Sequence, residues 1–64
     1  MSRIIINFST DSDAFREEDG SLNRNEVGTV INRISKYISL SGMDSGQVKD
    51  TNGNTVGTYE FVEE

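Results

Sequence analysis

The side chains best suited to do chemistry are carboxylates, and five of the eleven are gathered in one polar segment, residues 10–22. Five acids lie there against a single basic residue, Arg16. The five are Asp11, Asp13, Glu17, Glu18 and Asp19. Carboxylates accept charge-assisted hydrogen bonds from Arg and Lys of another protein, or they ligate hard cations at calcium-loop spacing. The spacing matches no calcium loop, so we predict no metal and no cofactor, and a basic protein surface is the expected partner.

Three more acids close the chain and are candidates for the same contact. They are Glu60, Glu63 and Glu64. They lie far from the first group in sequence, so one partner can contact both groups only if the fold brings them together.

Catalysis lacks its usual groups in this chain. The 64 residues contain no cysteine and no histidine. This removes a thiolate nucleophile, the usual general base and the commonest metal ligand. Serines and carboxylates are present, but no base or metal cluster surrounds any of them. We therefore predict no catalytic residues and no enzyme activity.

Composition narrows the classes of partner. The net charge is −5, from eleven acidic and six basic residues. This charge opposes direct binding to nucleic acid, where Lys and Arg must replace counterions. It suits a basic protein surface, including one that normally holds nucleic acid, although it can also serve solubility alone. No apolar run approaches the roughly 20 residues of a membrane span, and the N-terminus lacks a signal-peptide pattern. We predict one small domain over residues 1–64, inside the cell and off the membrane.

A helix is the clearest element. An apolar stripe recurs at steps of three and four residues, which predicts a helix from Arg24 to about Leu40. The stripe consists of Val27, Val30, Ile31, Ile34 and Ile38. Asn23 is a suitable N-cap, with Glu26 three positions later as in a capping box. Gly42 suits the left-handed residue that ends a helix.

The first strand is expected over residues 3–9. Ile4, Ile6 and Phe8 alternate with polar residues, which places them on the buried face. Ile5 then points to the outer face. Together with two tyrosines it is a candidate for contact with a second subunit or another protein; this set is Ile5, Tyr37 and Tyr59.

The polar segment between this strand and the helix contains one apolar step, Ala14-Phe15. Ser12 can cap a short helical turn there, and Gly20 can end it. We expect Phe15 to plug the edge of the core and to pin the segment down.

Two strands after the helix, residues 45–50 and 54–62, form a hairpin around Asn52-Gly53. A two-residue turn pairs Val48 with Gly57. A three-residue loop, with Asp50 starting a type I turn and Gly53 left-handed, pairs Val48 with Val56 and is preferred because it matches apolar residues. Val56 then has the opposite parity to Tyr59 and Phe61, so a bulge at or near Gly57 is needed.

The order strand, helix, strand, strand predicts an α+β domain with a single helix packed on a three-stranded, mainly antiparallel sheet. We expect the first strand beside the last and the middle strand at an edge. Parallel pairing of the first two strands is the alternative, and it would be right-handed. Either arrangement leaves an open edge for dimerisation or for a partner's strand.

The chain resembles a group of small phage and prophage proteins. Their pattern is a short apolar strand, a Thr-Asp or Thr-Asn step, Ala-Phe, an apolar helix and a closing Asp-x-Asn-Gly-Asn-x-Val-Gly hairpin. The matching positions are Ile4, Ile6, Thr10, Asp11, Ala14, Phe15, Ile31, Ile34, Gly46, Asp50, Asn52, Gly53, Asn54, Val56 and Gly57. The acidic insert, residues 16–23, is longer here than in that group. The resemblance implies a phage setting, and hence the cytoplasm of a bacterial host cell, without implying a mechanism.

Two functions follow as hypotheses. One is a stoichiometric inhibitor, of the anti-CRISPR or anti-restriction type, whose acids occupy arginine-lined sites of a host defence complex meant for phosphates. The alternative is a homo-oligomeric accessory module, such as a homodimer, with a small ligand at its interface. The acids carry the first function, and the exposed apolar residues carry the second.

Overall fold

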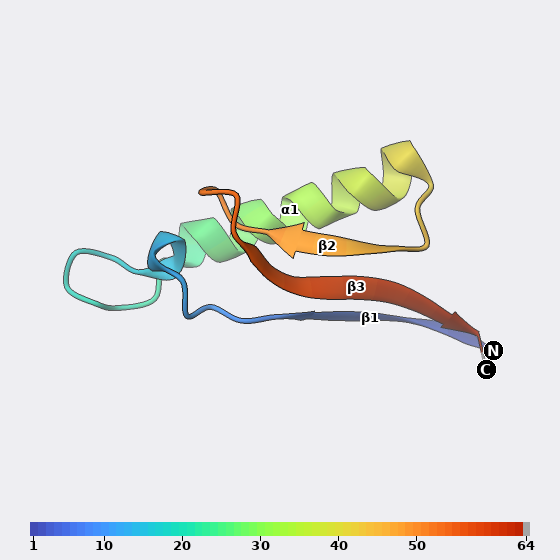
Figure 1. The fold of residues 1–64 in the computed structure, drawn as a ribbon, viewed down its shortest axis with the longest axis horizontal. Helices are drawn as coiled ribbons and strands as arrows, with labels where there is room; N and C mark the ends of the chain where they lie inside the picture. The colour runs from blue at the N-terminus through green and yellow to red at the C-terminus, as the bar shows by residue number, and fades with distance from the viewer. Residues whose placement is uncertain (64) are drawn as a thin grey trace.

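One helix packs across a three-stranded antiparallel sheet (Figure 1). The computed structural model describes residues 1–63. The elements in chain order are β1 (Ser2–Phe8), the 3₁₀ turn η1 (Asp13–Phe15), α1 (Arg24–Ser41), β2 (Ser45–Lys49) and β3 (Thr55–Glu63). The strand order is β1-β3-β2, and both pairings are antiparallel. The predicted α+β class and the position of the first strand beside the last are confirmed, and the parallel alternative is wrong.

Both ends of α1 follow the expected chemistry. The side chain of Asn23 accepts a hydrogen bond from the Glu26 amide at 3.2 Å, as an N-cap does. Gly42 is left-handed, with φ 62°. The capping-box half of the prediction is wrong, because the Glu26 carboxylate does not return to Asn23. It accepts hydrogen bonds from the amide and hydroxyl of Thr51 in the hairpin instead.

The hairpin uses the preferred three-residue loop. The Gly53 amide donates to the Asp50 carbonyl at 3.0 Å, and Gly53 is left-handed with φ 85°. Lys49 pairs with Thr55 beside this loop. The predicted pairing of Val48 with Val56 is wrong, however.

The bulge explains this difference in pairing. Val48 pairs with Gly57, so the register shifts between Val48 and Lys49 and Val56 is left opposite the shift. A bulge near Gly57 was predicted because Tyr59 must face the core. The extra, unpaired residue of this bulge is Val56, directly before Gly57. At Gly57 itself a Cβ would overlap the Asn7 carbonyl oxygen and the backbone of Phe8. β1 and β3 therefore approach each other too closely there for any other residue type.

The core lies between α1, η1 and the β2–β3 side of the sheet. Its fully buried hydrophobic members are Phe15, Val30, Ile34, Val48 and Tyr59. Phe15 plugs this core as predicted, and its ring stacks on Phe8 with centroids 6.0 Å apart. Tyr59 is only 2% exposed, so it is a core residue and its assignment to a surface contact is corrected.

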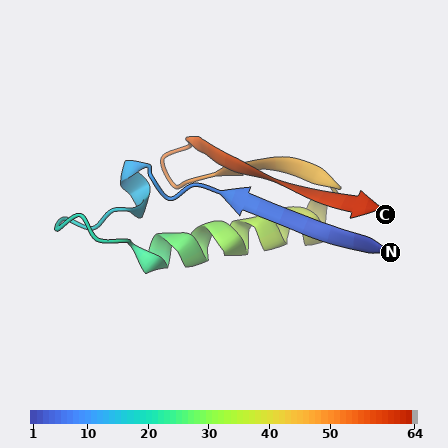
Figure 2. The ribbon, with the colours of Figure 1, turned by 90° about the horizontal axis from the view of Figure 1, so that it is seen from below.

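The helix covers only part of the sheet. In Figure 1, α1 runs alongside β2, and β1 lies at the far edge. Figure 2 shows the same layers from below, with β1 in front and the helix as a separate layer. Ile4 and Ile6 pair with Phe61 and Tyr59 and so share the face of the sheet that carries the core. Yet Ile4 is 51% exposed and Ile6 45%. The alternation of β1 is thus confirmed, and the expected burial of these two residues is wrong.

Candidate functional site

The five carboxylates lie in a folded loop between β1 and α1, here called the acidic loop, residues 11–21. Past η1 the chain turns back on itself. The Glu17 amide donates to the Ser21 carbonyl at 2.8 Å, and Arg16 forms an isolated bridge with Leu22. Gly20, with φ 86°, closes the turn by donating to the Glu17 carbonyl. The helical turn itself ends at Phe15, so the prediction that Gly20 ends it is wrong.

Three contacts fasten the acidic loop to the rest of the domain. Phe15 is buried in the core. The Asn23 amide donates to the Phe15 carbonyl at 2.7 Å, which ties the loop to the start of α1. The Ser12 hydroxyl donates to the Asp50 carboxylate at 2.7 Å instead of capping η1 as predicted. The loop is therefore held at its base by apolar and polar contacts, while its carboxylates remain outside.

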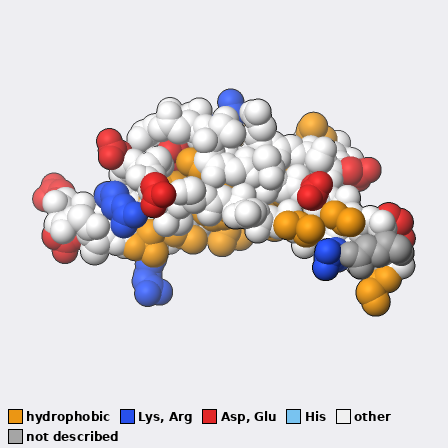
Figure 3. Space-filling model, turned by 60° about the horizontal axis from the view of Figure 1, so that its bottom comes forward, with side chains coloured by type: hydrophobic (Ala, Val, Ile, Leu, Met, Phe, Trp, Pro, Cys, Tyr) orange, Lys and Arg blue, Asp and Glu red, His pale blue; other side chains and the backbone are white. Residues whose placement is uncertain are grey.

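All five carboxylates of the loop belong to exposed residues. Figure 3 shows acidic side chains gathered at the end of the molecule that this loop forms. Glu17, Glu18 and Asp19 line an open surface hollow of about 460 Å³. Across residues 1–63, no group of three or more acidic side chains is arranged to hold a metal ion.

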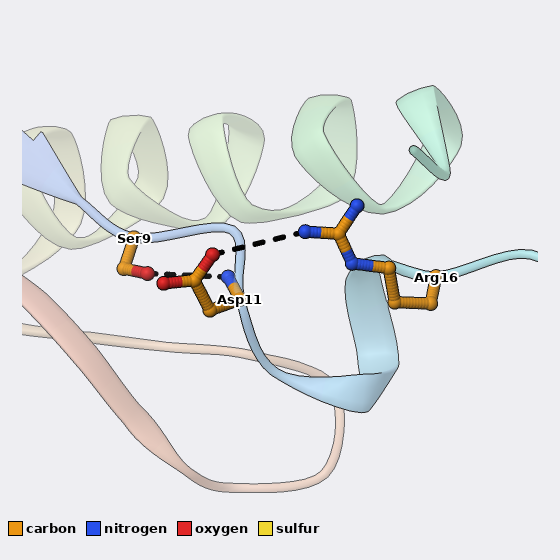
Figure 4. Close-up of polar contacts among 3 residues, drawn as sticks. All are labelled: Ser9, Asp11 and Arg16. Atoms are coloured by element: carbon orange, nitrogen blue, oxygen red, sulfur yellow. Dashed lines mark hydrogen bonds and ion pairs between the residues drawn. The ribbon is translucent and has the colours of Figure 1, made fainter. Parts of the chain in front are cut away.

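Two of the carboxylates have neighbours that fix them. Figure 4 shows the Asp11 carboxylate facing the Arg16 guanidinium, at 3.7 Å, while the Asp11 amide donates to the Ser9 hydroxyl. Asp19 accepts hydrogen bonds from the Ser21 hydroxyl at 2.6 Å and the Ser21 amide at 2.9 Å. These bonds, the hydroxyl first, lower the pKa of Asp19, so it stays charged at neutral and mildly acidic pH.

Of the other predicted acids, Glu60 lies on β3 opposite Ile5, and Glu63 lies at the end of the molecule opposite the acidic loop (Figure 1). The domain measures 43 Å along its long axis, with the acidic loop at one end and the two termini at the other (Figure 1). Glu60 is exposed on β3, and Glu63 lies 3.7 Å from the amino group of Met1. Glu64 lies outside the described residues. The structure therefore does not bring the two acidic groups together, and only the first forms a compact surface.

The predicted apolar contact residues are also separated. Ile5 pairs with Glu60 on the face of the sheet that points away from α1, whereas Tyr37 is exposed on the helix and Tyr59 is buried. A hollow of about 160 Å³ lies near Tyr37, lined also by Met43 and Lys49. It is smaller than the roughly 300 Å³ at which ligand pockets begin.

Sequence reasoning missed a set of buried polar contacts that join the hairpin to both neighbouring elements. Asp50 is fully buried and accepts hydrogen bonds from Ser12 and from the amide of Asn54. Arg33 of α1 donates to the Asp50 carbonyl at 3.1 Å. The only signal in the sequence was the preference for Asp at the start of this turn. It indicated the position of Asp50 in the turn but not the partners from distant segments.

The hairpin motif Asp-x-Asn-Gly-Asn thus has a structural role. The Asp50 carboxylate is hydrogen-bonded inside the domain, and the hydrogen bond from Ser12 is the main cause that lowers the pKa of Asp50. A buried carboxylate whose oxygens are already bonded is unsuited to bind a ligand. The acidic loop is therefore the candidate contact site, and the hairpin is the support that holds its base.

Comparisons with protein-family models, with curated proteins and with solved structures give no match to this chain. Within residues 1–63 no helix has both the length and the apolar character needed to cross a membrane. The functional conclusion therefore rests on the geometry and charge of the acidic loop.

Proposed function

We propose that this protein binds and inhibits a host defence complex by stoichiometric contact, as an anti-CRISPR or anti-restriction protein encoded by a phage. It acts by binding rather than by catalysis, in the cytoplasm of the bacterial host cell. The acidic loop is the contact surface, and its partner is a basic site on a protein that normally holds nucleic acid.

The observation that carries this proposal is the combination of an anchored loop and outward carboxylates. A flexible acidic segment would lose conformational entropy on binding, because its backbone would have to be ordered at that moment. Here Phe15 and the bond from Ser12 to Asp50 hold the base of the loop in advance. Preorganised carboxylates can accept the paired hydrogen bonds that Arg side chains otherwise donate to phosphates.

Charge supports the same partner class. A net charge of −5 on 64 residues accelerates encounter with a basic surface and repels nucleic acid itself. Within residues 1–63, Asp11 is the only carboxylate of the loop that forms an ion pair inside the domain. Of the other four, Asp19 accepts from Ser21 through one carboxylate oxygen, so its second oxygen and the carboxylates of Asp13, Glu17 and Glu18 remain available to a partner.

The test is inhibition of DNA cleavage by purified CRISPR effectors and restriction enzymes, titrated with this protein. We expect cleavage to stop near an equimolar ratio and inhibition to weaken as salt rises, because salt screens exposed charges. The variant Glu17→Lys/Glu18→Lys/Asp19→Lys should abolish inhibition while the circular-dichroism spectrum stays unchanged.

The control is Glu60→Lys/Glu63→Lys, which reverses two charges on β3, away from the acidic loop. It should inhibit nearly as well as the unmodified protein if contact is made through the loop. Full inhibition by the loop variant, or equal loss in both variants, would contradict the assignment of the loop as the contact surface.

The alternative, a homo-oligomeric accessory module, is supported by a different observation. Three large apolar side chains on the helix-facing side of the sheet, here called the bare strip, are only partly covered. They are Ile4, Ile6 and Phe61, which are 51%, 45% and 41% exposed. Such a strip at the edge of a small sheet is typical of a surface that is covered on assembly.

A further inference from the structure

The two edges of the sheet differ in how well they are protected against pairing. β2 is five residues long, carries Lys49 and ends in a register shift, all of which discourage added strands. β1 is seven residues long and pairs with β3 without a shift from Ser2 to Phe8. It contains no proline and one charged residue, Arg3. β1 is therefore the edge at which a further strand can pair.

The hydrogen-bond phase of β1 identifies which backbone groups face outward. The Ser9 amide donates to the Val56 carbonyl at 2.9 Å, at the end of the β1–β3 register. Hydrogen-bonded residue pairs alternate with unbonded pairs along an antiparallel ladder. The backbone amides and carbonyls of Asn7, Ile5 and Arg3 therefore also point toward β3. The Phe61 amide donates to the Asp44 carbonyl on the other side of β3. The backbone of Phe61 therefore points away from β1, as this alternation requires. The amides and carbonyls of Ile4 and Ile6 thus face the open edge.

We propose that β1 pairs antiparallel with β1 of a second copy of this chain, about a two-fold axis at Ile5. The two three-stranded sheets then join into one six-stranded sheet. Ile4 lies opposite Ile6 of the second copy, and these outward-facing residues form the hydrogen-bonded pairs. Ile5 faces Ile5 of the second copy as a pair without hydrogen bonds, which brings those two side chains closest.

A second copy suits this edge because β1 is complementary to itself. The register centred on Ile5 uses all seven residues and matches isoleucine with isoleucine. It places Arg3 opposite Asn7 rather than opposite another Arg3, so no like charges meet. β1 also has no acidic residue, although the chain carries a net charge of −5. Pairing through β1 therefore keeps the acidic loops away from the axis.

The bare strip gives the pairing an apolar component. A two-fold axis at Ile5 brings the Ile4 and Ile6 side chains of the two copies together on the helix-facing side. Figure 3 shows hydrophobic side chains along the underside of the molecule, between its two ends. On the helix, Ile31 is 51% exposed and lies on the flank opposite Glu26 and Arg33, which contact the hairpin. Ile31 of each copy thus borders the joined strip.

Self-association through β1 is independent of the acidic loop, although it supplies the assembly that the alternative function requires. It is tested without any defence complex, by sedimentation equilibrium of the full chain from micromolar to millimolar concentration. We expect a reversible monomer–dimer equilibrium. A strict monomer over the whole range would overturn the proposal and leave the inhibitor function untouched.

Two variants test the edge itself. Ile4→Pro removes an outward amide, a position where an edge strand tolerates proline, and Ile5→Lys places two lysines face to face across the axis. Each should weaken dimerisation about tenfold or more without loss of the folded circular-dichroism spectrum. Asn32→Lys, on the exposed face of α1, makes a control that adds the same charge and should dimerise normally.

The test does not depend on both variants folding. If Ile4→Pro fails to fold, Ile5→Lys still reports on the axis, because its side chain lies on the face away from the core. Dimerisation of a folded Ile5→Lys variant with unmodified affinity would overturn the pairing through β1.

Discussion

The two halves of the helix-facing side of the sheet have similar sequence patterns but different burial. On the β2 half, Val48 is fully buried under α1. On the β1 half, Ile4 and Ile6 alternate just as regularly yet remain about half exposed. A helix is about 10 Å wide and strands are about 4.8 Å apart, so one helix covers only about two strands. The covered half contains the core, and the uncovered half is the surface at which we propose contact with a second copy.

The largest effect is expected from a substitution that forces β1 away from β3 at Gly57, where the two strands lie very close together. In Gly57→Ala the new Cβ meets backbone atoms, which cannot move aside without shifting a strand. We expect destabilisation on the order of 4 kcal/mol, close to the whole stability of so small a domain. Urea unfolding followed by circular dichroism measures it.

Gly28→Ala is the matched control for Gly57→Ala. A Cβ at Gly28 meets no atom within 4 Å, and alanine is the better helix former. This variant should be more stable than the unmodified protein by about 0.5–1 kcal/mol. A Gly57→Ala protein as stable as the Gly28→Ala protein would disprove the close approach of β1 and β3.

The second prediction compares two isoleucines on one helix. Ile34 belongs to the core and is 2% exposed, whereas Ile31 is 51% exposed. Ile34→Ala should cost about 2–4 kcal/mol of unfolding free energy, because it opens a cavity. Ile31→Ala should cost less than about 1 kcal/mol, measured at low concentration where the monomer dominates. Equal losses would mean that Ile31 is packed as closely as Ile34, which would contradict the one-sided burial of α1.

The third and smallest effect concerns the polar support of the acidic loop. The hydrogen bond from Ser12 lowers the pKa of Asp50 below its ordinary value of 3.8. A carboxyl group with a lowered folded pKa stabilises the protein above that ordinary value, and this stability is lost as pH falls through the folded pKa. Thermal unfolding between neutral pH and pH values below 3.8 should therefore show a drop in melting temperature at the acid end.

Ser12→Ala removes the main cause of that pKa shift, so its melting temperature should fall less steeply with acid. Ser35→Ala, at an exposed serine of α1, is the control and should keep the acid profile of the unmodified protein. A Ser12→Ala protein with an unchanged acid profile would remove the link between the loop and Asp50.

The local features of the fold were predictable from the sequence. Asn23 and Gly42 mark the ends of α1 through cap chemistry that involves only nearby residues. Gly53 marks the hairpin for the same reason. The bulge followed from a parity conflict between Val56 and Tyr59, and the prediction that it lies at or near Gly57 is confirmed. The pairing of Val48 with Val56 was wrong because Val56 is itself the extra residue.

The remaining features depend on contacts between distant segments. Alternation shows which side of β1 faces the helix layer, but it does not show how far that layer extends, so the exposure of Ile4 was missed. Ser12 and Asp50 are 38 positions apart, and no local pattern connects them. For the candidate site, the carboxylates could be located from the sequence. Only the structure shows that Asp19 and Glu63 lie at opposite ends of the molecule.

Hydrogen exchange in β1, followed by NMR at increasing protein concentration, tests most directly whether the uncovered half is a contact between copies. The amides of Ile5 and Asn7 point toward β3 and should be protected at every concentration. Those of Ile4 and Ile6 face the open edge, so they should exchange rapidly in dilute protein and become protected as dimers form. Rapid exchange of Ile4 and Ile6 at the highest concentration would contradict the account, because their backbone groups would then still face water.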